Sequence, residues 1–161
     1  MGRVYRSGYG MYVCNGILYN HESPRRGENF VTQKIVRGAA SIVQGKAETL
    51  ELGNTEIERD WGYAPDYVLG MWMMLQEEQA DDYILATGKT HKLSDFLQLS
   101  FEYFGLDHQK HIRINPKFVR PNEPQKLCGD SSKAQKILGW QPSVSFEEMV
   151  HEMCRDAEKS N

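Results

Sequence analysis

The stretch NHESPRRGENF, residues 20–30, decides how this chain of 161 residues is interpreted. It follows the apolar run 11–19 and precedes a segment with helical spacing, so two adjacent cations, a histidine, a proline and a glycine stand at a strand-to-helix junction. In an open α/β sheet, ligands bind beyond the carboxyl ends of the strands. We therefore predict that residues 20–30 receive an anionic ligand. The alternative is a solvated turn, because Pro and Gly also mark ordinary turns.

The segments around this stretch alternate between strand and helix patterns, which predicts an α/β fold. The near-continuous apolar run 11–19 predicts a strand covered on both faces, as in a parallel sheet. Residues 30–44 carry apolar side chains at three- and four-residue spacing, which predicts an amphipathic helix with Asn29 as N-cap and Gly45 at its end. Further strands are expected at residues 49–52 and 83–86, and an extended segment at residues 110–120.

Four more helices are expected along the chain. One begins near Pro65, because a first helical turn tolerates proline. Its apolar stripe is interpreted as core packing and consists of Tyr67, Val68, Met71, Trp72, Met74 and Leu75. Residues 93–104 and 131–138 have helical spacing before a glycine, the second with Asp130 as its cap. The last helix opens with Ser145 and Glu148, a capping-box match.

Composition limits the class of protein. With 40% hydrophobic and 25% charged residues, the chain can bury the core of one domain. A net charge of -3, without any segment that concentrates the cations, argues against nucleic-acid binding. The three cysteines are far apart and form no disulfide framework or zinc motif, which favours a reducing, cytoplasmic setting. No apolar stretch is long enough to cross a bilayer and no signal-peptide pattern is present, so we expect no membrane contact.

Basic side chains recur at the ends of the expected elements. They are Arg25 and Arg26 with Lys34, then Arg59, then Arg120 beside Glu123. The planar fork of arginine matches two phosphate oxygens, although each residue taken singly also fits a surface ion pair. His21 fits a base, a ligand contact or a structural histidine. The chain has no GxGxxG loop, P-loop or HExxH motif. The residues alone predict an α/β domain that binds an anion and lacks a complete set of catalytic residues.

Several motifs resemble those of the GDP-mannose 4,6-dehydratase family. The most specific are GILYNHESPRRG at residues 16–27 and NFVTQKI at residues 29–35. Weaker matches are LGN at 52–54, RDWG at 59–62, DY at 66–67, MW at 71–72, ATG at 86–88, RPNE at 120–123 and GD at 129–130. The tail 133–142 is similar to the whole extended short-chain dehydrogenase/reductase group. The resemblance runs over nearly the full chain but covers only the C-terminal half of the family.

The resemblance implies the C-terminal part of a Rossmann-like fold without its nucleotide-binding half. Residues 1–28 would form the last Rossmann strand and the junction, and residues 29–161 a mixed substrate-binding region. The family reaction is NADP-assisted oxidation at sugar C4 of GDP-mannose, loss of water across C5 and C6, and return of hydride to C6. The glycine-rich loop, a catalytic Thr and Glu and the Tyr-xxx-Lys pair belong to the other half. We therefore assign no catalytic residue and no metal, and expect the isolated chain to be inactive.

Binding roles carry over residue by residue. His21 and Arg26 match positions that contact NADP. Positions that contact GDP-mannose are matched by Asn20, Asn29, Lys34, Arg59, Arg120 and Glu123. Lys34 and the arginines would neutralise the diphosphate, while Glu123 would accept a hydrogen bond from a hydroxyl. The sequence departs from the family in a shorter stretch between residues 105 and 115 and at Gln33, where an Arg is common.

Three functions remain open at this point. The favoured one is a fragment or split subunit of a GDP-mannose 4,6-dehydratase. The second is a stand-alone GDP-sugar-binding module or pseudoenzyme, and the third is a truncated sugar-nucleotide epimerase or reductase, against which the HESPRRG string counts. Because the strand at residues 11–19 would lack neighbours, we expect a homo-oligomer or pairing with a chain that supplies the N-terminal half.

Overall fold

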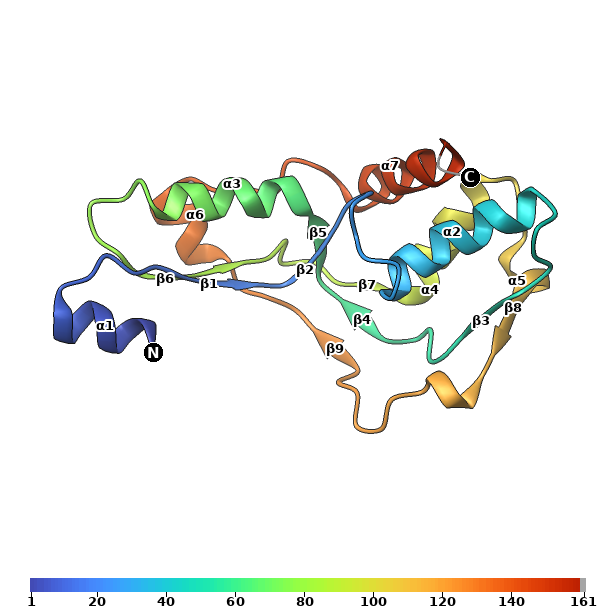
Figure 1. Cartoon of the computed structure of the whole chain (residues 1–161), viewed down its shortest axis with the longest axis horizontal. Helices are drawn as coiled ribbons and strands as arrows, with labels where there is room; N and C mark the ends of the chain where they lie inside the picture. The colour runs from blue at the N-terminus through green and yellow to red at the C-terminus, as the bar shows by residue number, and fades with distance from the viewer. Residues whose placement is uncertain (160–161) are drawn as a thin grey trace.

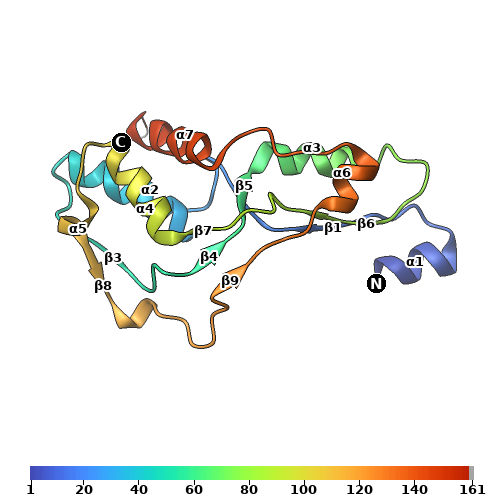
Figure 2. The same cartoon turned by 180° about the vertical axis from the view of Figure 1, so that it is seen from behind.

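Two groups of elements lie at opposite ends of an elongated molecule, which a computed structural model describes for residues 1–159 (Figures 1 and 2). The sheet lobe consists of α1 (Gly2–Tyr9), β1 (Asn15–Leu18), α3 (Ala64–Met74), β6 (Asp82–Leu85) and α6 (Ser132–Leu138). The helix lobe consists of α2 (Val31–Val43), β3 (Leu50–Leu52), α4 (Leu93–Tyr103), α5 (His108–His111), β8 (Ile112–Ile114) and α7 (Phe146–Lys159). Between the lobes lie β2 (Asn20–Glu22), β4 (Glu58–Arg59), β5 (Trp61–Tyr63), β7 (His91–Lys92) and β9 (Lys126–Leu127). The 3₁₀ turn Pro116–Phe118 follows β8 below the helix lobe in Figure 1.

The strands pair in four small sheets. Three are parallel pairs, namely β1 with β6, β2 with β5 and β3 with β8. In the fourth sheet, β4 lies between β7, which is antiparallel to it, and β9, which is parallel. The parallel pairs join segments far apart in sequence, which is typical of an α/β chain with helical crossovers.

The helix lobe contains the larger core. Helices α2, α4 and α7 pack against one another, because each carries an apolar stripe at helical spacing. Ile35 of α2, Phe101 of α4 and Val150 of α7 are completely buried there. The helices predicted at residues 30–44 and 93–104 and after Ser145 are confirmed, as is the Ser145–Glu148 capping box, in which each residue accepts the other's backbone N–H.

The sheet lobe is covered on one side only. Helices α3 and α6 both lie on the same side of β1 and β6 (Figure 1). Along β6, Tyr83 and Leu85 are buried, whereas Ile17 of β1 is 54% exposed. The prediction of a strand at residues 11–19 covered on both faces is therefore wrong in its length and in its burial. Helices of the described chain cover only one face of these strands.

Helix α3 has the predicted Pro65 in its first turn, but most of its apolar stripe is not core. Tyr67 and Met74 are buried. The other four residues of the stripe are exposed, namely Val68, Met71, Trp72 and Leu75. The core interpretation is wrong for these four, because the side chains of a helix reach the core only where another element lies against them.

Several element boundaries also differ from the expectation. Phe30, not Asn29, precedes the first turn of α2, and no side chain caps that turn. The N-cap of α6 is Ser131, with Asp130 accepting from the Ser132 N–H at 2.9 Å. Residues 110–120 are extended only in β8 and then form the 3₁₀ turn, because Asn115 accepts from the Lys117 N–H. The polar residues at the start of the chain form helix α1.

The carboxylate of Asp60 ties the elements between the lobes together. It is fully buried and accepts hydrogen bonds from the N–H groups of Thr87, Gly88 and Gly129 at 2.8, 2.9 and 3.1 Å. These donors follow β6 and β9, so one side chain fixes the carboxyl ends of two strands relative to β4 and β5. Among residues 1–159, none of the helices has both the length and the apolar character needed to span a bilayer.

Candidate functional site

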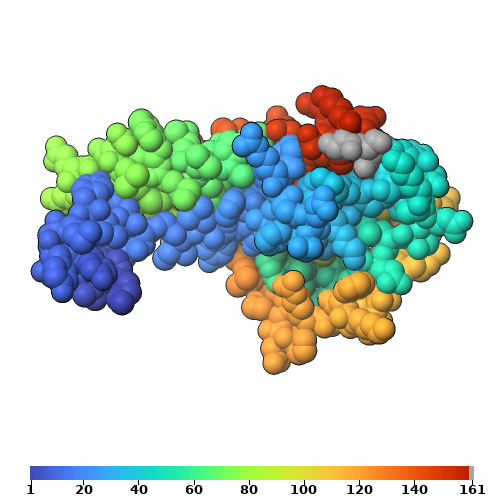
Figure 3. Space-filling model, in the orientation of Figure 1, coloured from blue at the N-terminus to red at the C-terminus, as the bar shows by residue number. Residues whose placement is uncertain are grey.

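A cavity of about 680 Å³ lies where β2, the first turn of α2, β4 and the 3₁₀ turn meet. We call it the front cavity. Figure 3 shows the hollow below the light-blue surface of α2 and above the orange surface of the region around residues 115–125. All six predicted substrate residues line it, namely Asn20, Asn29, Lys34, Arg59, Arg120 and Glu123. The tertiary structure thus brings together residues that lie as far apart in the sequence as Asn20 and Glu123.

The side chains of strand β2 point in two directions, into the front cavity and away from it. Asn20 and Glu22 line the front cavity, whereas His21 does not, because successive side chains of a strand point to opposite faces. The His21 ring stacks on Tyr67 with a centroid distance of 5.1 Å, and its Nδ1–H donates to the Tyr19 carbonyl at 2.8 Å. This bond places the ring proton on Nδ1 and leaves Nε2 without a protein partner among the described residues.

The Arg26 side chain lies on the cavity side of β2, where its guanidinium donates to the His21 carbonyl at 3.4 Å, away from the His21 ring. Its Nε lies 3.2 Å from Oε2 of Glu22, and its guanidinium lies over the Phe30 ring, 3.5 Å from the centroid. Glu22 is 1% exposed and also accepts a hydrogen bond from the Thr32 hydroxyl at 2.6 Å. Burial raises the pKa of Glu22, while Thr32 and Arg26 act in the opposite direction. The predicted NADP residues His21 and Arg26 therefore do not share one surface.

Arg59 is held in place by the protein. Its guanidinium bonds Oε1 of Glu123 at 2.9 Å and the carbonyl oxygens of Glu58 and Pro124 at 2.8 and 2.9 Å. The carboxylate that the sequence placed beside Arg120 thus pairs with Arg59. A ligand at this wall would meet a fixed guanidinium whose charge is partly compensated.

Three cationic side chains of the cavity have no carboxylate partner among residues 1–159. Lys34 donates to the Glu51 carbonyl and lies 4.2 Å from the centroid of the Phe118 ring. Arg120 and Lys117 line the cavity, and no hydrogen bond or ion pair to another described residue holds their side chains. The guanidinium group of Arg120 and the ammonium group of Lys117 are therefore available to donate hydrogen bonds to a ligand.

Sequence reasoning missed Lys117 and Phe118, which it placed in an extended segment. The signal was Asn115 before Pro116, a pattern that starts a helical turn. Gly53 lets this turn approach, because a Cβ at Gly53 would lie 2.4 Å from the Phe118 carbonyl oxygen. Glu22 was also missed as a wall residue of the cavity.

The front cavity is positive. It contains five basic residues, Arg26, Lys34, Arg59, Lys117 and Arg120, against two acidic ones, Glu22 and Glu123. A volume between about 300 and 1,000 Å³ is typical of small-molecule sites. Several arginines and lysines that converge on such a space are suited to the phosphate oxygens of a ligand. No group of three or more potential metal-binding His, Cys, Asp or Glu side chains occurs in the described part of the chain.

A sequence profile described as GDP-mannose 4,6 dehydratase matches residues 1–153. The chain belongs to the GDP-mannose 4,6-dehydratase family. GDP-mannose 4,6 dehydratase 1 of Arabidopsis thaliana is 53% identical over 149 residues, which are 92% of this chain and 41% of that protein. The Drosophila melanogaster GDP-mannose 4,6 dehydratase is 48% identical over 168 aligned residues, with coverages of 94% and 42%. This member of the GDP-mannose 4,6-dehydratase family thus spans less than half the length of these relatives.

Solved structures confirm the predicted fold. RMD from Pseudomonas aeruginosa in complex with NADPH superposes with a TM-score of 0.87 at 21% identity, over 98% of this chain and 51% of that one. The dTDP-glucose 4,6-dehydratase of Bacillus anthracis in complex with NAD has a TM-score of 0.84 at 16% identity, with coverages of 98% and 48%. The chain therefore has the α/β architecture of about half of an extended, Rossmann-like short-chain dehydrogenase.

Proposed function

We propose that the front cavity binds GDP-mannose and that residues 1–161 form the C-terminal, sugar-nucleotide-binding portion of a GDP-mannose 4,6-dehydratase. The observation that carries this proposal is the convergence of Lys34, Arg59, Lys117 and Arg120 on one cavity. A diphosphate spreads its charge over several oxygens and needs donors from more than one direction. Membership of the dehydratase family and the names of its relatives support GDP-mannose as the sugar nucleotide.

Each wall of the cavity has a role in this proposal. Arg120 and Lys117 would bond the diphosphate, since they have no competing partner among the described residues. Arg59 would add a fixed donor. Asn20 and Asn29 would contact the remainder of the sugar nucleotide, and Glu123 would accept from a hydroxyl with the oxygen that Arg59 leaves free.

We propose NADP as the redox cofactor of the complete enzyme, held chiefly by a segment other than these 161 residues. The oxidised cofactor would take up the hydride in the sugar oxidation. The present residues fit it poorly, because they include no glycine-rich loop between a strand and a helix. Of the two predicted contacts, His21 offers Nε2 beside Tyr67, and Arg26 is engaged by Glu22 on the other side of β2.

We also propose that the exposed apolar surfaces of the sheet lobe, namely the uncovered side of β1 and β6 and the outward face of α3, are docking surfaces, one of them for the nucleotide-binding half, and that the chain self-associates when they are free. The free edge of β1, Ile17 and the exposed apolar residues of α3 support this proposal. A strand edge that is unpaired and flanked by apolar side chains favours association. A monomeric, sharply melting species of 18.5 kDa in light scattering and calorimetry would contradict it.

Isothermal titration calorimetry with GDP-mannose tests the binding site. Arg120→Ala should weaken binding by about 1.5–3 kcal/mol, the range for a hydrogen bond to a charged group. Arg37→Ala is the matched control, because Arg37 is on α2 outside the cavity and pairs with Glu28 at 2.6 Å. Arg59→Ala should also weaken binding, but it removes the partner of Glu123 as well. Equal affinities of the wild type and Arg120→Ala would refute the proposal.

An activity assay separates a dehydratase subunit from a plain binding module. We expect no GDP-4-keto-6-deoxymannose from the isolated chain, because the proton-transfer residues implied for the family are not among its residues. Turnover should appear when a nucleotide-binding half with a glycine-rich loop and a Tyr-xxx-Lys pair is added together with NADP. Binding of GDP-mannose without turnover in that mixture would favour a GDP-sugar-binding module.

A further inference from the structure

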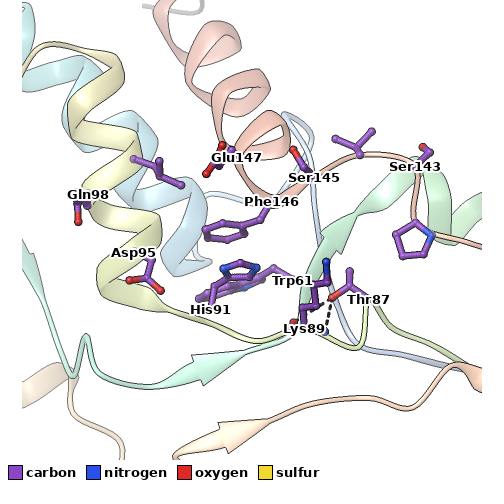
Figure 4. A pocket seen from close by; sticks show the side chains of 13 residues that line it. Trp61, Thr87, Lys89, His91, Asp95, Gln98, Ser143, Ser145, Phe146 and Glu147 are labelled. Atoms are coloured by element: carbon purple, nitrogen blue, oxygen red, sulfur yellow. Dashed lines mark hydrogen bonds between the residues drawn. The ribbon is translucent and has the colours of Figure 1, made fainter.

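A second cavity, of about 780 Å³, lies between the loop after β6, the first turns of α4 and the start of α7 (Figure 4). We call it the rear cavity. It shares Trp61 with the front cavity, and none of the six predicted substrate residues lines it. Its volume falls within the range of about 300–1,000 Å³ that is usual for small-molecule sites. A sugar nucleotide bound in the front cavity would not use the rear cavity, because the two share only Trp61.

Stacked rings form the apolar part of the rear cavity. The rings of His91 and Phe146 are parallel within 4° at a centroid distance of 3.8 Å, as Figure 4 shows. The ring centroids of Trp61 and Phe146 are 6.0 Å apart, and their ring planes are inclined by 21°. Leu99 and Val144, both half-buried, extend this surface. The cavity therefore has a wall whose rings and aliphatic side chains come from four elements, β5, β7, α4 and α7, and from Val144 just before α7, rather than from one loop.

Polar side chains without protein partners surround these rings. Among residues 1–159, no hydrogen bond or ion pair engages the ammonium group of Lys89, the ring nitrogens of His91 or the carboxylate of Glu147. Asp95 uses one carboxylate oxygen to accept from the Lys92 N–H and keeps the other free. By contrast, the hydroxyl of Ser145, also on the wall, is bonded to Glu148. In Figure 4 these side chains lie around the rings: Asp95 and Glu147 in the first turns of α4 and α7, and Lys89 in the loop after β6.

The charge of the rear cavity is opposite to that of the front cavity. Lys89 is its cation, against the carboxylates of Asp95 and Glu147. Burial lowers the pKa of His91, so the ring is neutral near pH 7 and offers one donor and one acceptor. A phosphate-bearing ligand would be repelled here. A neutral ligand with several hydroxyl groups can use carboxylates, an ammonium group and an imidazole at once.

We propose that the rear cavity is a second binding site, for a neutral polyhydroxylated ring of the monosaccharide type. Such a ring has an apolar C–H face, which packs against Phe146 and Val144, and hydroxyl groups at its edge. The hydroxyls donate to Glu147 and Asp95 and accept from Lys89. The site is separate from the sugar-nucleotide function, because it takes an uncharged ligand and uses different residues.

A titration with two probes tests the proposal on the full chain. Methyl α-D-mannopyranoside should shift the His91 ring resonances in NMR spectra and saturate at millimolar concentrations, with the signals of Arg120 unchanged. Inorganic pyrophosphate should do the reverse. Glycerol, which has hydroxyl groups but no ring face, should shift His91 far less. Absence of a His91 shift up to tens of millimolar glycoside, or displacement of the glycoside by pyrophosphate, would overturn the assignment.

Exposed-residue variants keep the fold intact and give a matched comparison. Glu147→Gln and Lys89→Ala should each weaken glycoside binding by about threefold to tenfold, the equivalent of one net hydrogen bond. Glu78→Gln, an exposed carboxylate in the loop after α3, should leave it unchanged. An affinity for the glycoside that is the same in Glu147→Gln, Glu78→Gln and the wild type would refute the site. Pyrophosphate binding should be normal in all three variants, which separates failure of this proposal from failure of the front cavity.

Discussion

In the helix lobe, helices α2, α4 and α7 enclose a core of eighteen buried residues, whereas the sheet lobe buries a cluster of seven. In the helix lobe, α2, α4 and α7 pack against one another and cover the apolar side chains from several sides. The sheet lobe places α3 and α6 on one side of β1 and β6 and leaves Ile17 and four apolar residues of α3 exposed. The difference teaches that the helix lobe closes its core with its own elements, whereas the sheet lobe keeps apolar surface exposed. Hydrophobic stabilisation scales with the apolar area removed from water, so the two lobes should differ in stability.

Removal of a buried ring should have the largest effect. Phe101→Ala should cost about 3–5 kcal/mol of stability, because it leaves a cavity in the helix lobe where Phe101 is fully buried. Phe118→Ala removes the same ring from an exposed position and should cost less than about 1 kcal/mol. Urea unfolding followed by circular dichroism measures both. Similar losses in the two variants would contradict a closed core in the helix lobe.

Loss of the Asp60 carboxylate should uncouple the lobes. Asp60→Ala leaves the buried N–H groups of Thr87, Gly88 and Gly129 without their acceptor, at a cost of about 1–3 kcal/mol for each unsatisfied group before relaxation. We expect separate unfolding of the helix lobe and the sheet lobe in hydrogen exchange. Asp130→Asn, a change at an exposed carboxylate, is the control. Joint unfolding of both lobes in Asp60→Ala would show that other contacts couple them.

The pH dependence of stability should show the contribution of Glu22, which is buried in β2 between the lobes. Glu22 has a pKa raised above its ordinary value of 4.5 because it is buried, so the folded state holds the proton more tightly than the unfolded state. Its favourable contribution is present below pH 4.5 and is lost as the pH rises through the raised value. Glu22→Gln should therefore reduce the decline in stability between pH 4.5 and neutrality. Denaturant midpoints measured across this range test it, and parallel curves would contradict it.

The smallest change in stability should come from the exposed face of α3. Trp72 is 59% exposed, so Trp72→Lys should change the free energy of unfolding by no more than about 0.5 kcal/mol. The same variant should weaken association of the chain, because a charge would stand in a proposed docking surface. Sedimentation at several concentrations measures this association. Lys136→Ala, an exposed change on α6, serves as the control. Unchanged association in Trp72→Lys would remove α3 from the interface.

Local patterns predicted the helices of the helix lobe well. The spacing of Ile35 and Ala39 in α2 and of Phe96 and Phe101 in α4 marks one apolar face, and those faces meet in the core. The same reasoning was wrong for Val68 and Trp72, although their spacing is equally regular. A pattern shows which face of a helix is apolar. It does not show whether an element of the same chain covers that face.

The front cavity was predictable in part. The resemblance of residues 16–35, 59–62 and 120–123 to the dehydratase family predicted six of its wall residues from the sequence. Lys117 was not found, because its place depends on the 3₁₀ turn that Asn115 starts and on the close approach that Gly53 permits. The opposite directions of His21 and Glu22 follow from strand alternation, but only the structure showed that residues 20–22 are a strand.

The sequence by itself determined the family, the α/β class, the helices with one apolar face and four of the five basic residues of the front cavity, because these depend on residue type and local spacing. Only the tertiary structure decided which cations keep a free charge, since Glu123 pairs with Arg59 rather than with Arg120. It also decided that the stripe on α3 faces outward and that two cavities of opposite charge share the wall at Trp61. Pairing and burial are properties of neighbours in space, and most of those neighbours are distant in the sequence.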